Sequence, residues 1–221
     1  MSQTDADVAA APAPSATSVL SGLVRQLRPA LAGMVVLTLL TGVLYPALIY
    51  GIGRAAFPDQ ADGSLVKRGG VVVGSRLIGQ GFARPEYFQP RPSAAGNGYD
   101  ATQSSGTNLA PGNPKLIAAV GQAAADYRKL NRIAAGTPVP IDAVTSSGSG
   151  LDPEISPENA ALQVPRIAAA RCPVASRCVR PILDLVAAHT RGRDLGVLGQ
   201  PRVEVLELNL ALDRALPMRR P

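Results

Sequence analysis

The sequence predicts one membrane-spanning helix followed by a single mixed α+β domain. The span is indicated by an uncharged apolar stretch from Pro29 to Gly53. The domain is indicated by strand-like runs and capped helical patterns that lack regular βαβ order. With 221 residues, the chain is long enough for one anchor and one domain of ordinary size. We therefore divide it into a flexible tail (1–26), a transmembrane helix (27–56), an α+β domain (57–216) and a C-terminal tail (217–221).

The composition is that of a globular protein with some lipid-facing surface. Hydrophobic residues make up 46% of the chain and charged residues 17%. Residues 1–18 are rich in Ala, Ser, Thr, Asp and Pro and show no apolar periodicity, so we expect them to be disordered. The net charge of +6 is spread over single basic residues, without nucleic-acid-binding motifs. It suits lipid headgroups or an acidic partner, and we expect no nucleic-acid partner.

The apolar stretch is long enough to cross a bilayer. About 25 residues at a rise of about 1.5 Å per residue exceed the hydrocarbon thickness of about 30 Å. Thr38 and Thr41 are polar, and their hydroxyls can bond back to helix carbonyls. A cleavable signal peptide would have a shorter apolar region, of about 7 to 15 residues, so we expect an uncleaved anchor.

The span also carries features suited to helix partners, although Gly and Pro are common in membrane helices generally. Small residues allow close helix approach, and a proline kink needs a neighbour to stabilise it. Basic residues flank both ends of the span, so charge leaves its orientation open. The candidate contacts with partner helices are Gly33, Thr38, Thr41, Gly42, Tyr45 and Pro46.

The domain should begin with short strands and then a long loop. Val71 to Ile78 is β-branched and aliphatic between glycines, which predicts a strand or a tight pair of strands. From Pro85 to Pro114 prolines, glycines and polar pairs predict an extended, ordered loop. Loops of this length usually have a function. The candidate partner-contact residues in it are Arg91, Pro92, Ser93, Asn108, Leu109, Asn113 and Pro114.

Three helices and a final strand are expected after the loop. Asn113 and Pro114 form a start signal for a helix with an apolar face. A second helix should begin at Ser156-Pro157 and bend at Pro165, and a third should run from about Pro181 to His189. The alternation in PRVEVLELNLALD predicts a half-buried C-terminal strand, with a bulge near Val205-Leu206. The apolar face of the first helix comprises Leu116, Ile117, Val120, Ala124, Tyr127 and Leu130.

The sequence contains none of the motifs that would let the chain hydrolyse ATP by itself. It lacks a Walker loop, a dinucleotide fingerprint and the Asp-Lys-Thr-Gly phosphorylation sequence. His189 is expected to cap a helix or lie at the surface. Glu204 and Glu207 do not form an acid/base pair on a strand. We predict no catalytic residue and no metal site.

One glycine-rich run could present amides to a phosphate. It lacks the lysine and the strand-to-helix context of a phosphate loop, so a flexible turn is the competing interpretation. The weak candidates for nucleotide contact are Ser146, Ser147, Gly148, Ser149 and Gly150.

The two cysteines, Cys172 and Cys178, have no metal or redox spacing. They could form a small disulfide if the domain lies outside the cytoplasm. Two buried thiols are the alternative.

Many ordered blocks of the chain, from Leu27 to Leu216, resemble the C chain of Kdp-type potassium-transporting ATPases. The segment from Arg171 to Arg180 departs from the pattern, being longer than and unlike what we expect of the family. The blocks that carry the resemblance are LRPAL, TGVLYPALIY, GSLV, GSRLIGQGF, YFQPRPSAAG, SSGTNLAPGNP, VTSSGSGLDPEISPENAALQVPRIAAAR and GQPRVEVLELNLALDRAL.

The resemblance implies a non-catalytic accessory subunit of an ATP-driven potassium pump in the bacterial inner membrane. Its N-terminus would be cytoplasmic and its domain extracytoplasmic. Its partners would be a channel-like A subunit, a P-type ATPase B subunit, a small F subunit and membrane lipid. The family is also described as a catalytic chaperone that raises the ATP affinity of the ATPase subunit. No cofactor is then expected on this chain itself.

Two other classes of function remain open on the sequence alone. One is a membrane-anchored extracytoplasmic binding or hydrolase domain, for which we find no catalytic set. The other is a nucleotide-binding regulator that uses the Gly/Ser run, which would require the domain to be cytosolic.

Overall fold

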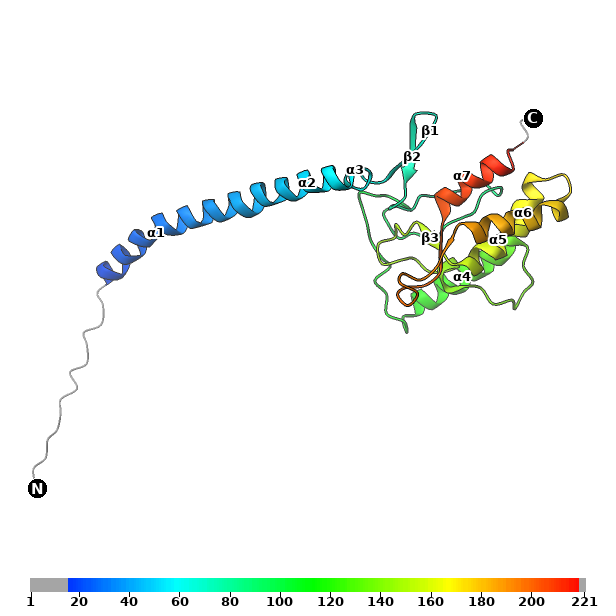
Figure 1. Ribbon diagram of the computed structural model, residues 1–221. Helices are drawn as coiled ribbons and strands as arrows, with labels where there is room; N and C mark the ends of the chain where they lie inside the picture. Colours follow the sequence, from blue (N-terminus) through cyan, green and yellow to red (C-terminus); the bar gives the residue numbers. More distant parts are fainter. Residues whose placement is uncertain (1–15, 219–221) are drawn as a thin grey trace, which may run out of the picture. The chain divides into compact units, whose positions relative to one another are not determined.

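A computed structural model describes residues 16–218 and divides them into two units, which meet between Ala61 and Asp62 (Figure 1). The first unit is helical throughout most of its described length. The second contains four longer helices and two small antiparallel sheets. The predicted class, a candidate spanning helix followed by a mixed α+β domain, is confirmed.

The first unit is one long helical stretch followed by a short helix. It consists of α1 (Ala16–Leu39), a π-helical turn (Leu40–Leu44), α2 (Tyr45–Ala56) and α3 (Pro58–Ala61). Within it, Val24–Ala56 is long and apolar enough to cross a membrane, and none of its most apolar window is buried in the structure. Residues 16–26, which the sequence analysis assigned to a flexible tail, are helical. Residues 1–15 lie outside the described residues.

The π-helical turn ends two residues before Pro46, the second of the two prolines in the candidate span. Pro46 has no N–H to donate, and its ring would collide with the carbonyl four residues earlier in a regular α-helix. Widening the turn over Leu40–Leu44 relieves that collision without ending the helix. The Thr41 hydroxyl donates to the Leu37 carbonyl at 2.7 Å, as expected for threonine in an apolar helix.

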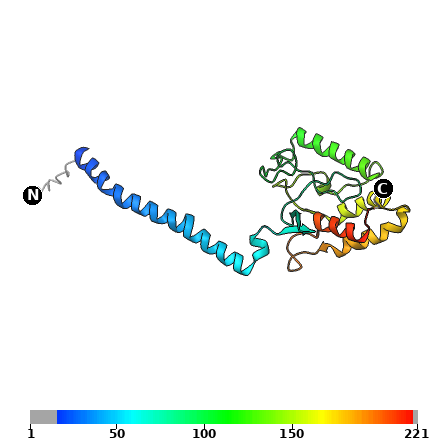
Figure 2. The ribbon, with the colours of Figure 1, turned by 90° about the horizontal axis from the view of Figure 1, so that it is seen from above.

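In the second unit, α5 (Pro157–Arg171) and α6 (Ala175–Ala188) pack together with α7 (Val205–Ala215) around the core (Figure 2). Helix α4 (Pro114–Asn131) lies on the other side of α5. One sheet has the order β3 (Glu154–Ile155), β5 (Arg202–Glu204), β4 (Thr190–Arg191). The other is the hairpin of β1 (Leu65–Arg68) and β2 (Val71–Ser75). A 3₁₀ turn spans Ile141–Ala143.

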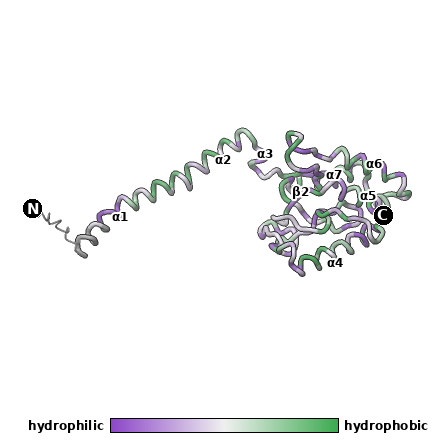
Figure 3. Tube along the Cα trace, turned by 90° about the horizontal axis from the view of Figure 1, so that it is seen from below, coloured by the Kyte–Doolittle hydropathy of each residue, from purple (hydrophilic) through white to green (hydrophobic). Residues whose placement is uncertain are grey.

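The core lies between α5, α6, α7 and the sheet. Figure 3 shows hydrophobic segments distributed along the long helix as well as inside the second unit. The buried cluster consists of Phe88, Ile155, Ala160, Val164, Ile167, Ala168, Cys178, Ile182, Val186, Val203, Val205, Leu208 and Leu212.

Two predicted helix starts are confirmed by their caps. The Asn113 side chain accepts from the Lys115 N–H at 2.9 Å, and Pro114 is the first residue of α4. The Ser156 hydroxyl accepts from the Asn159 N–H at 3.1 Å at the start of α5. The third helix is longer than predicted, because α6 begins at Ala175 and contains Pro181 in its interior.

The predicted C-terminal strand is wrong beyond its first residues. Only Arg202–Glu204 is a strand, and α7 follows it immediately. The buried Glu204 carboxylate accepts the N–H groups of Leu206 and Glu207, which caps the helix. The phase change interpreted as a bulge is therefore a helix N-terminus. Helix α7 buries residues on several sides, so its apolar pattern lacks a clear helical period.

Candidate partner interface

The predicted ordered loop from Pro85 to Pro114 has no helix or strand before α4. Helix side chains form hydrogen bonds with the backbone of its first part, as a neighbouring strand would in a sheet. The Phe88 N–H donates to Asn209 Oδ1 at 2.8 Å, and the Phe88 carbonyl accepts from Asn209 Nδ2 at 2.9 Å. Asn209 lies on α7 and is 2% exposed. Phe88 itself is fully buried in the core, so this point of the loop is fixed by packing and by two hydrogen bonds.

A second amide grips the next loop residue from helix α5. The Gln89 N–H donates to Gln163 Oε1 at 2.8 Å, and Gln163 Nε2 donates to the Gln89 carbonyl at 3.0 Å. Gln163 is 1% exposed and also donates to Asn159 Oδ1 at 3.0 Å. Two consecutive loop residues are thus held by amides from two different helices.

A buried guanidinium extends this grip. Arg166 Nη1 donates to the carbonyls of Pro85 and Tyr87, the latter at 3.0 Å. Its other nitrogens donate to Gln163 Oε1 at 2.7 Å and Asn131 Oδ1 at 2.8 Å. Burial lowers the pKa of Arg166 to about 10, so the side chain stays charged at neutral pH. The oxygens that accept hydrogen bonds from this cation are all neutral. Because a buried charge needs such partners, the loop carbonyls help to keep the Arg166 side chain stable in its buried position.

Arg171 ties the same part of the loop to the end of α7. Its side chain is completely buried and donates to the carbonyls of Glu86 and Leu216, each at 2.8 Å. It also pairs with Asp213 at 2.9 Å and lies 4.8 Å from the centre of the Tyr87 ring. Burial, together with the neighbouring Asp213 charge, raises the pKa of the Tyr87 hydroxyl.

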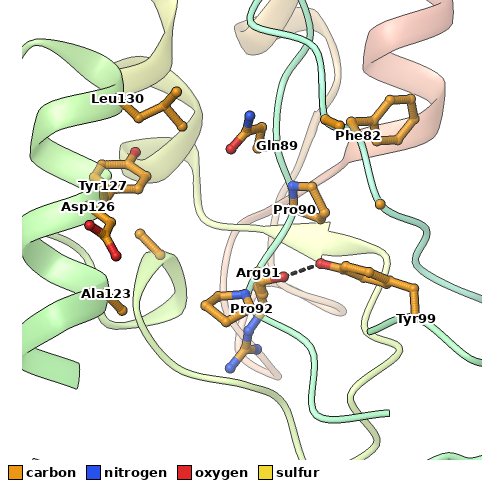
Figure 4. A pocket seen from close by; sticks show the side chains of 13 residues that line it. Phe82, Gln89, Pro90, Arg91, Pro92, Tyr99, Ala123, Asp126, Tyr127 and Leu130 are labelled. Carbon is orange, nitrogen blue, oxygen red and sulfur yellow. Dashed lines mark hydrogen bonds between the residues drawn. The ribbon is translucent and has the colours of Figure 1, made fainter. Parts of the chain in front are cut away.

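The middle of the loop folds on the segment that follows α4. The Ser93 hydroxyl accepts from the Tyr99 N–H at 2.8 Å and donates to the Gly150 carbonyl at 2.6 Å. Arg91 pairs with Asp152 at 2.8 Å, and the Tyr99 hydroxyl donates to the Arg91 carbonyl (Figure 4). Arg91 and Ser93, which we predicted as partner contacts, therefore also shape the loop.

The Gly/Ser run, Ser146 to Gly150, forms hydrogen bonds with the loop. The Ser146 hydroxyl accepts from the Ala94 N–H at 3.1 Å, and the Ser149 carbonyl accepts from the Ser105 N–H at 2.9 Å. Gly150 has a φ of +68°, and an added Cβ would lie 2.5 Å from the Ser105 carbonyl oxygen. This position therefore requires glycine. Residues of the run thus make hydrogen bonds with the loop. This holds whether the run is interpreted as a nucleotide contact or as a turn.

A groove lies between the loop and α4 (Figure 4). Its volume is about 680 Å³. On its wall the Nε–H of Arg91 is buried and has no acceptor within the described part of the chain. Burial raises the pKa values of Tyr99 and Tyr127 above their ordinary range, so both stay neutral. The lining includes Phe82, Pro90, Pro92 and Tyr99 from the loop side and Ala123, Tyr127 and Leu130 from α4.

The other predicted contact residues are not brought together at one place. Asn108 has a φ of +52° in the outer part of the loop, beside Leu109. Asn113 and Pro114 are used to start α4. The span residues Gly33, Thr38, Thr41, Gly42, Tyr45 and Pro46 belong to the first unit, where every one of them is exposed.

His189, Cys172 and Cys178 have structural partners. His189 ends α6, with its Nδ1 2.9 Å from the Leu185 carbonyl. Cys172 and Cys178 form a disulfide between α5 and α6, which decides between the two alternatives left open by the sequence. Among residues 16–218 there is no group of three or more His, Cys, Asp or Glu that could hold a metal ion.

Sequence reasoning missed the side chains that hold the loop. Gln163 and Arg166 fell in the predicted second helix, Arg171 in the segment after it and Asn209 in the predicted C-terminal strand, and none of the four was given a role. The available signal was a polar residue within a run of apolar residues, as with Asn209 between Leu208 and Leu210. Such a residue has to find a buried partner, but the sequence does not say which one.

A helix that is long and apolar enough to cross a membrane, followed by an α+β domain built around a tightly held loop, defines a protein with one candidate span and one folded domain. The chain belongs to the KdpC family: the family model described as K+-transporting ATPase, c chain, matches residues 27–214. It is thus a subunit of the potassium-transporting ATPase type, which confirms the resemblance seen in the sequence.

Its relatives cover most of the chain. It is 54% identical over 190 residues to a protein of Mycobacterium tuberculosis (strain ATCC 25618 / H37Rv) named potassium-transporting ATPase KdpC subunit, covering 86% of this chain and 98% of that protein. A protein of Beijerinckia indica with the same name is 51% identical over 202 residues, covering 90% and 98%. One of Caulobacter vibrioides is 52% identical over 196 residues, covering 88% and 96%.

Proposed function

We propose that this chain is a non-catalytic accessory subunit that assembles and stabilises an ATP-driven potassium uptake pump. Its span would pack on partner helices in the bacterial inner membrane, with the N-terminus cytoplasmic and the domain outside. Its partners would be the channel-like A subunit, the P-type ATPase B subunit and the small F subunit. The family membership and the candidate span support this proposal.

The single observation that carries the proposal is the pre-organised loop beside the groove. Asn209 and Gln163 fix the backbone of two loop residues before any partner arrives. A surface that is already ordered loses little conformational entropy on binding. The groove is mainly apolar, as the buried centre of a protein interface usually is.

We extend the proposal to the effect of the family on ATP affinity. If the domain is extracytoplasmic, it raises the ATP affinity of the ATPase subunit through a coupling free energy passed along the membrane part. Direct contact through Ser146–Gly150 is the alternative form. The indirect form is favoured because Ser146, Ser149 and Gly150 already make hydrogen bonds with the loop. ATP would then be bound by the ATPase subunit alone.

The interface is tested with two alanines of α4. Ala123 lines the groove, whereas Ala125 is exposed two residues later on the same helix and does not line it. We expect Ala123→Arg to fill the groove and reduce recovery of the chain with a tagged ATPase subunit in detergent by about tenfold. Ala125→Arg should leave recovery unchanged.

Three results would contradict the proposal. Equal recovery of both arginine variants would remove the groove from the interface. Truncation after Gly53 should keep membrane targeting and abolish recovery of the complex; if recovery were unchanged, the domain would have no part in assembly. Turnover of a hydrolase substrate by the purified chain would favour the alternative of an anchored enzyme.

A further inference from the structure

The hairpin β1–β2 exposes apolar side chains on a small sheet of its own. Within the described residues it pairs with no third strand. A two-stranded hairpin is at best marginally stable in water, and it usually needs another surface to cover its apolar side chains. The side chains of Leu65, Val71, Val72 and Leu77 are 47%, 66%, 48% and 61% exposed.

Charge on this segment has a single sign. Between Gly63 and Pro85 the sequence has four basic residues and no acidic one. Arg68 pairs with Asp213 and Arg76 with Glu207, each at 2.8 Å, which fixes the hairpin to α7. Lys67 is exposed near the tip and forms no ion pair within residues 16–218. An apolar tip with unopposed positive charge is complementary to a surface that is apolar inside and negative outside.

The chain also keeps the hairpin near the membrane. Ala56 ends the candidate span and Leu65 begins β1, so nine residue steps separate them. Even fully extended, these steps cover only about 30 Å. A connection of this length gives the hairpin a high effective concentration at the bilayer surface, whatever else the domain binds.

We propose that the β1–β2 hairpin is a second membrane contact, which docks on anionic phospholipid beside the span. Val71 and Val72 lie at the level of the headgroups and upper acyl chains, while Lys67 binds headgroup phosphates. The ion pairs of Arg68 and Arg76 with α7 connect the docked hairpin to the rest of the domain. The inference does not depend on assembly of the pump, because it needs only this chain and a bilayer.

The contact is measured with a fluorophore on the full-length chain in vesicles. The native cysteines form a disulfide, so an introduced cysteine is the one labelled. Val71→Cys places an environment-sensitive NBD label on the hairpin. Val197→Cys is the matched control, because Val197 is 71% exposed on the loop between β4 and β5. Figure 1 shows that loop and the hairpin at opposite ends of the second unit.

In vesicles of phosphatidylcholine and phosphatidylglycerol with nitroxide-labelled acyl chains, the Val71 label should be quenched several-fold more than the Val197 label. One basic residue near an anionic surface contributes about 1 kcal/mol, or about fivefold in an equilibrium constant. Lys67→Ser should therefore reduce the ratio of docked to free hairpin about fivefold. The same loss is expected in vesicles of phosphatidylcholine alone.

Three outcomes would overturn the inference. Equal quenching of the two labels would show that the hairpin has no preference for lipid. Unchanged quenching in phosphatidylcholine alone would remove the role of anionic headgroups. A Val71 label that is shielded only in the assembled pump, without lipid quenching, would assign the hairpin to a protein partner.

Discussion

At the residue scale, the loop shows how a few buried polar side chains replace a strand partner. Backbone N–H and C=O groups that leave water must find other partners. Asn209 and Gln163 each supply one donor and one acceptor to a single loop residue, which is the pattern an adjacent strand would provide. The loop can therefore be irregular in shape while the backbone N–H and C=O groups at its most buried point still have hydrogen-bond partners.

Glu204 makes the stability of the fold depend on pH. Burial raises its pKa from 4.5 to about 7, although the N–H groups that it caps oppose this shift. The folded state thus binds a proton more tightly than the unfolded state does. This contribution to the free energy of unfolding is complete below about pH 4.5 and is lost as the pH rises to about 7. The pKa shift corresponds to about 3 kcal/mol.

We predict that Glu204→Gln removes this contribution. Across pH 4.5 to 7, the difference in free energy of unfolding between the native chain and the variant should change by about 3 kcal/mol. Denaturant titrations of both proteins at a series of pH values in one detergent measure that difference. Other groups titrate alike in both proteins and cancel. A difference that stays constant with pH would show that Glu204 remains ionised in the fold.

The sequence identified residues that act locally and missed those that act at a distance. Asn113 and Ser156 were predicted as helix caps because each binds an N–H only two or three residues away. Asn209 binds Phe88 across 121 residues of chain. The residue types alone do not specify that pairing, because any buried backbone segment could have met the same amide.

At the element scale, the disulfide fixes the turn between α5 and α6. Cys172 follows the last residue of α5 and Cys178 lies in the first turns of α6, where it joins the core. Closing so short a segment removes entropy from the unfolded chain, for a stabilisation of about 2 kcal/mol. The segment from Cys172 to Cys178 thus acts as a local brace.

We predict that reduction lowers the free energy of unfolding by about 2 kcal/mol. Thermal unfolding of the full chain in detergent, with and without dithiothreitol, measures the change. The double variant Cys172→Ala/Cys178→Ala should resemble the reduced protein and should not respond to the reagent. A response of this variant to dithiothreitol would show that the reagent acts elsewhere.

The predicted elements succeed where a local signal marks their ends. The loop from Pro85 and the helices at Pro114 and Pro157 were confirmed because prolines and capping residues mark them. The C-terminal helix was missed because alternating leucines in LELNLAL suggest a strand. Helix α7 buries Leu206, Leu208 and Leu212, of which Leu208 and Leu212 belong to the core cluster, so burial overrides the apparent period of two.

At the scale of the whole molecule, the described chain consists of a candidate span and a domain whose hydrophobic core contains no residue of the span. All thirteen members of the core cluster lie between Phe88 and Leu212, inside the second unit. Length and hydropathy were enough to predict the span, since lipid imposes a simple requirement on both. The arrangement of the domain depends on long-range pairing, which the sequence pattern does not encode as directly.

We predict that a fragment of residues 62–221 folds without the span. Because its core includes no residue of the first unit, it should be soluble without detergent and unfold in one cooperative transition. Near-ultraviolet circular dichroism and calorimetry measure this, with the full chain in detergent as the reference. A fragment with helical signal but no cooperative transition would show that the domain needs the span or the bilayer to fold.

Asn209 and Gln163 bind the loop through its main-chain N–H and C=O groups, which every amino acid except proline provides. The side chain of Gln89 can therefore change to suit a different partner surface, provided that the new residue is not proline and still offers its N–H. Asn209 and Gln163 have no such latitude, because their own side chains make the contacts. Recognition can thus diverge along the loop while the scaffold beneath it is inherited unaltered.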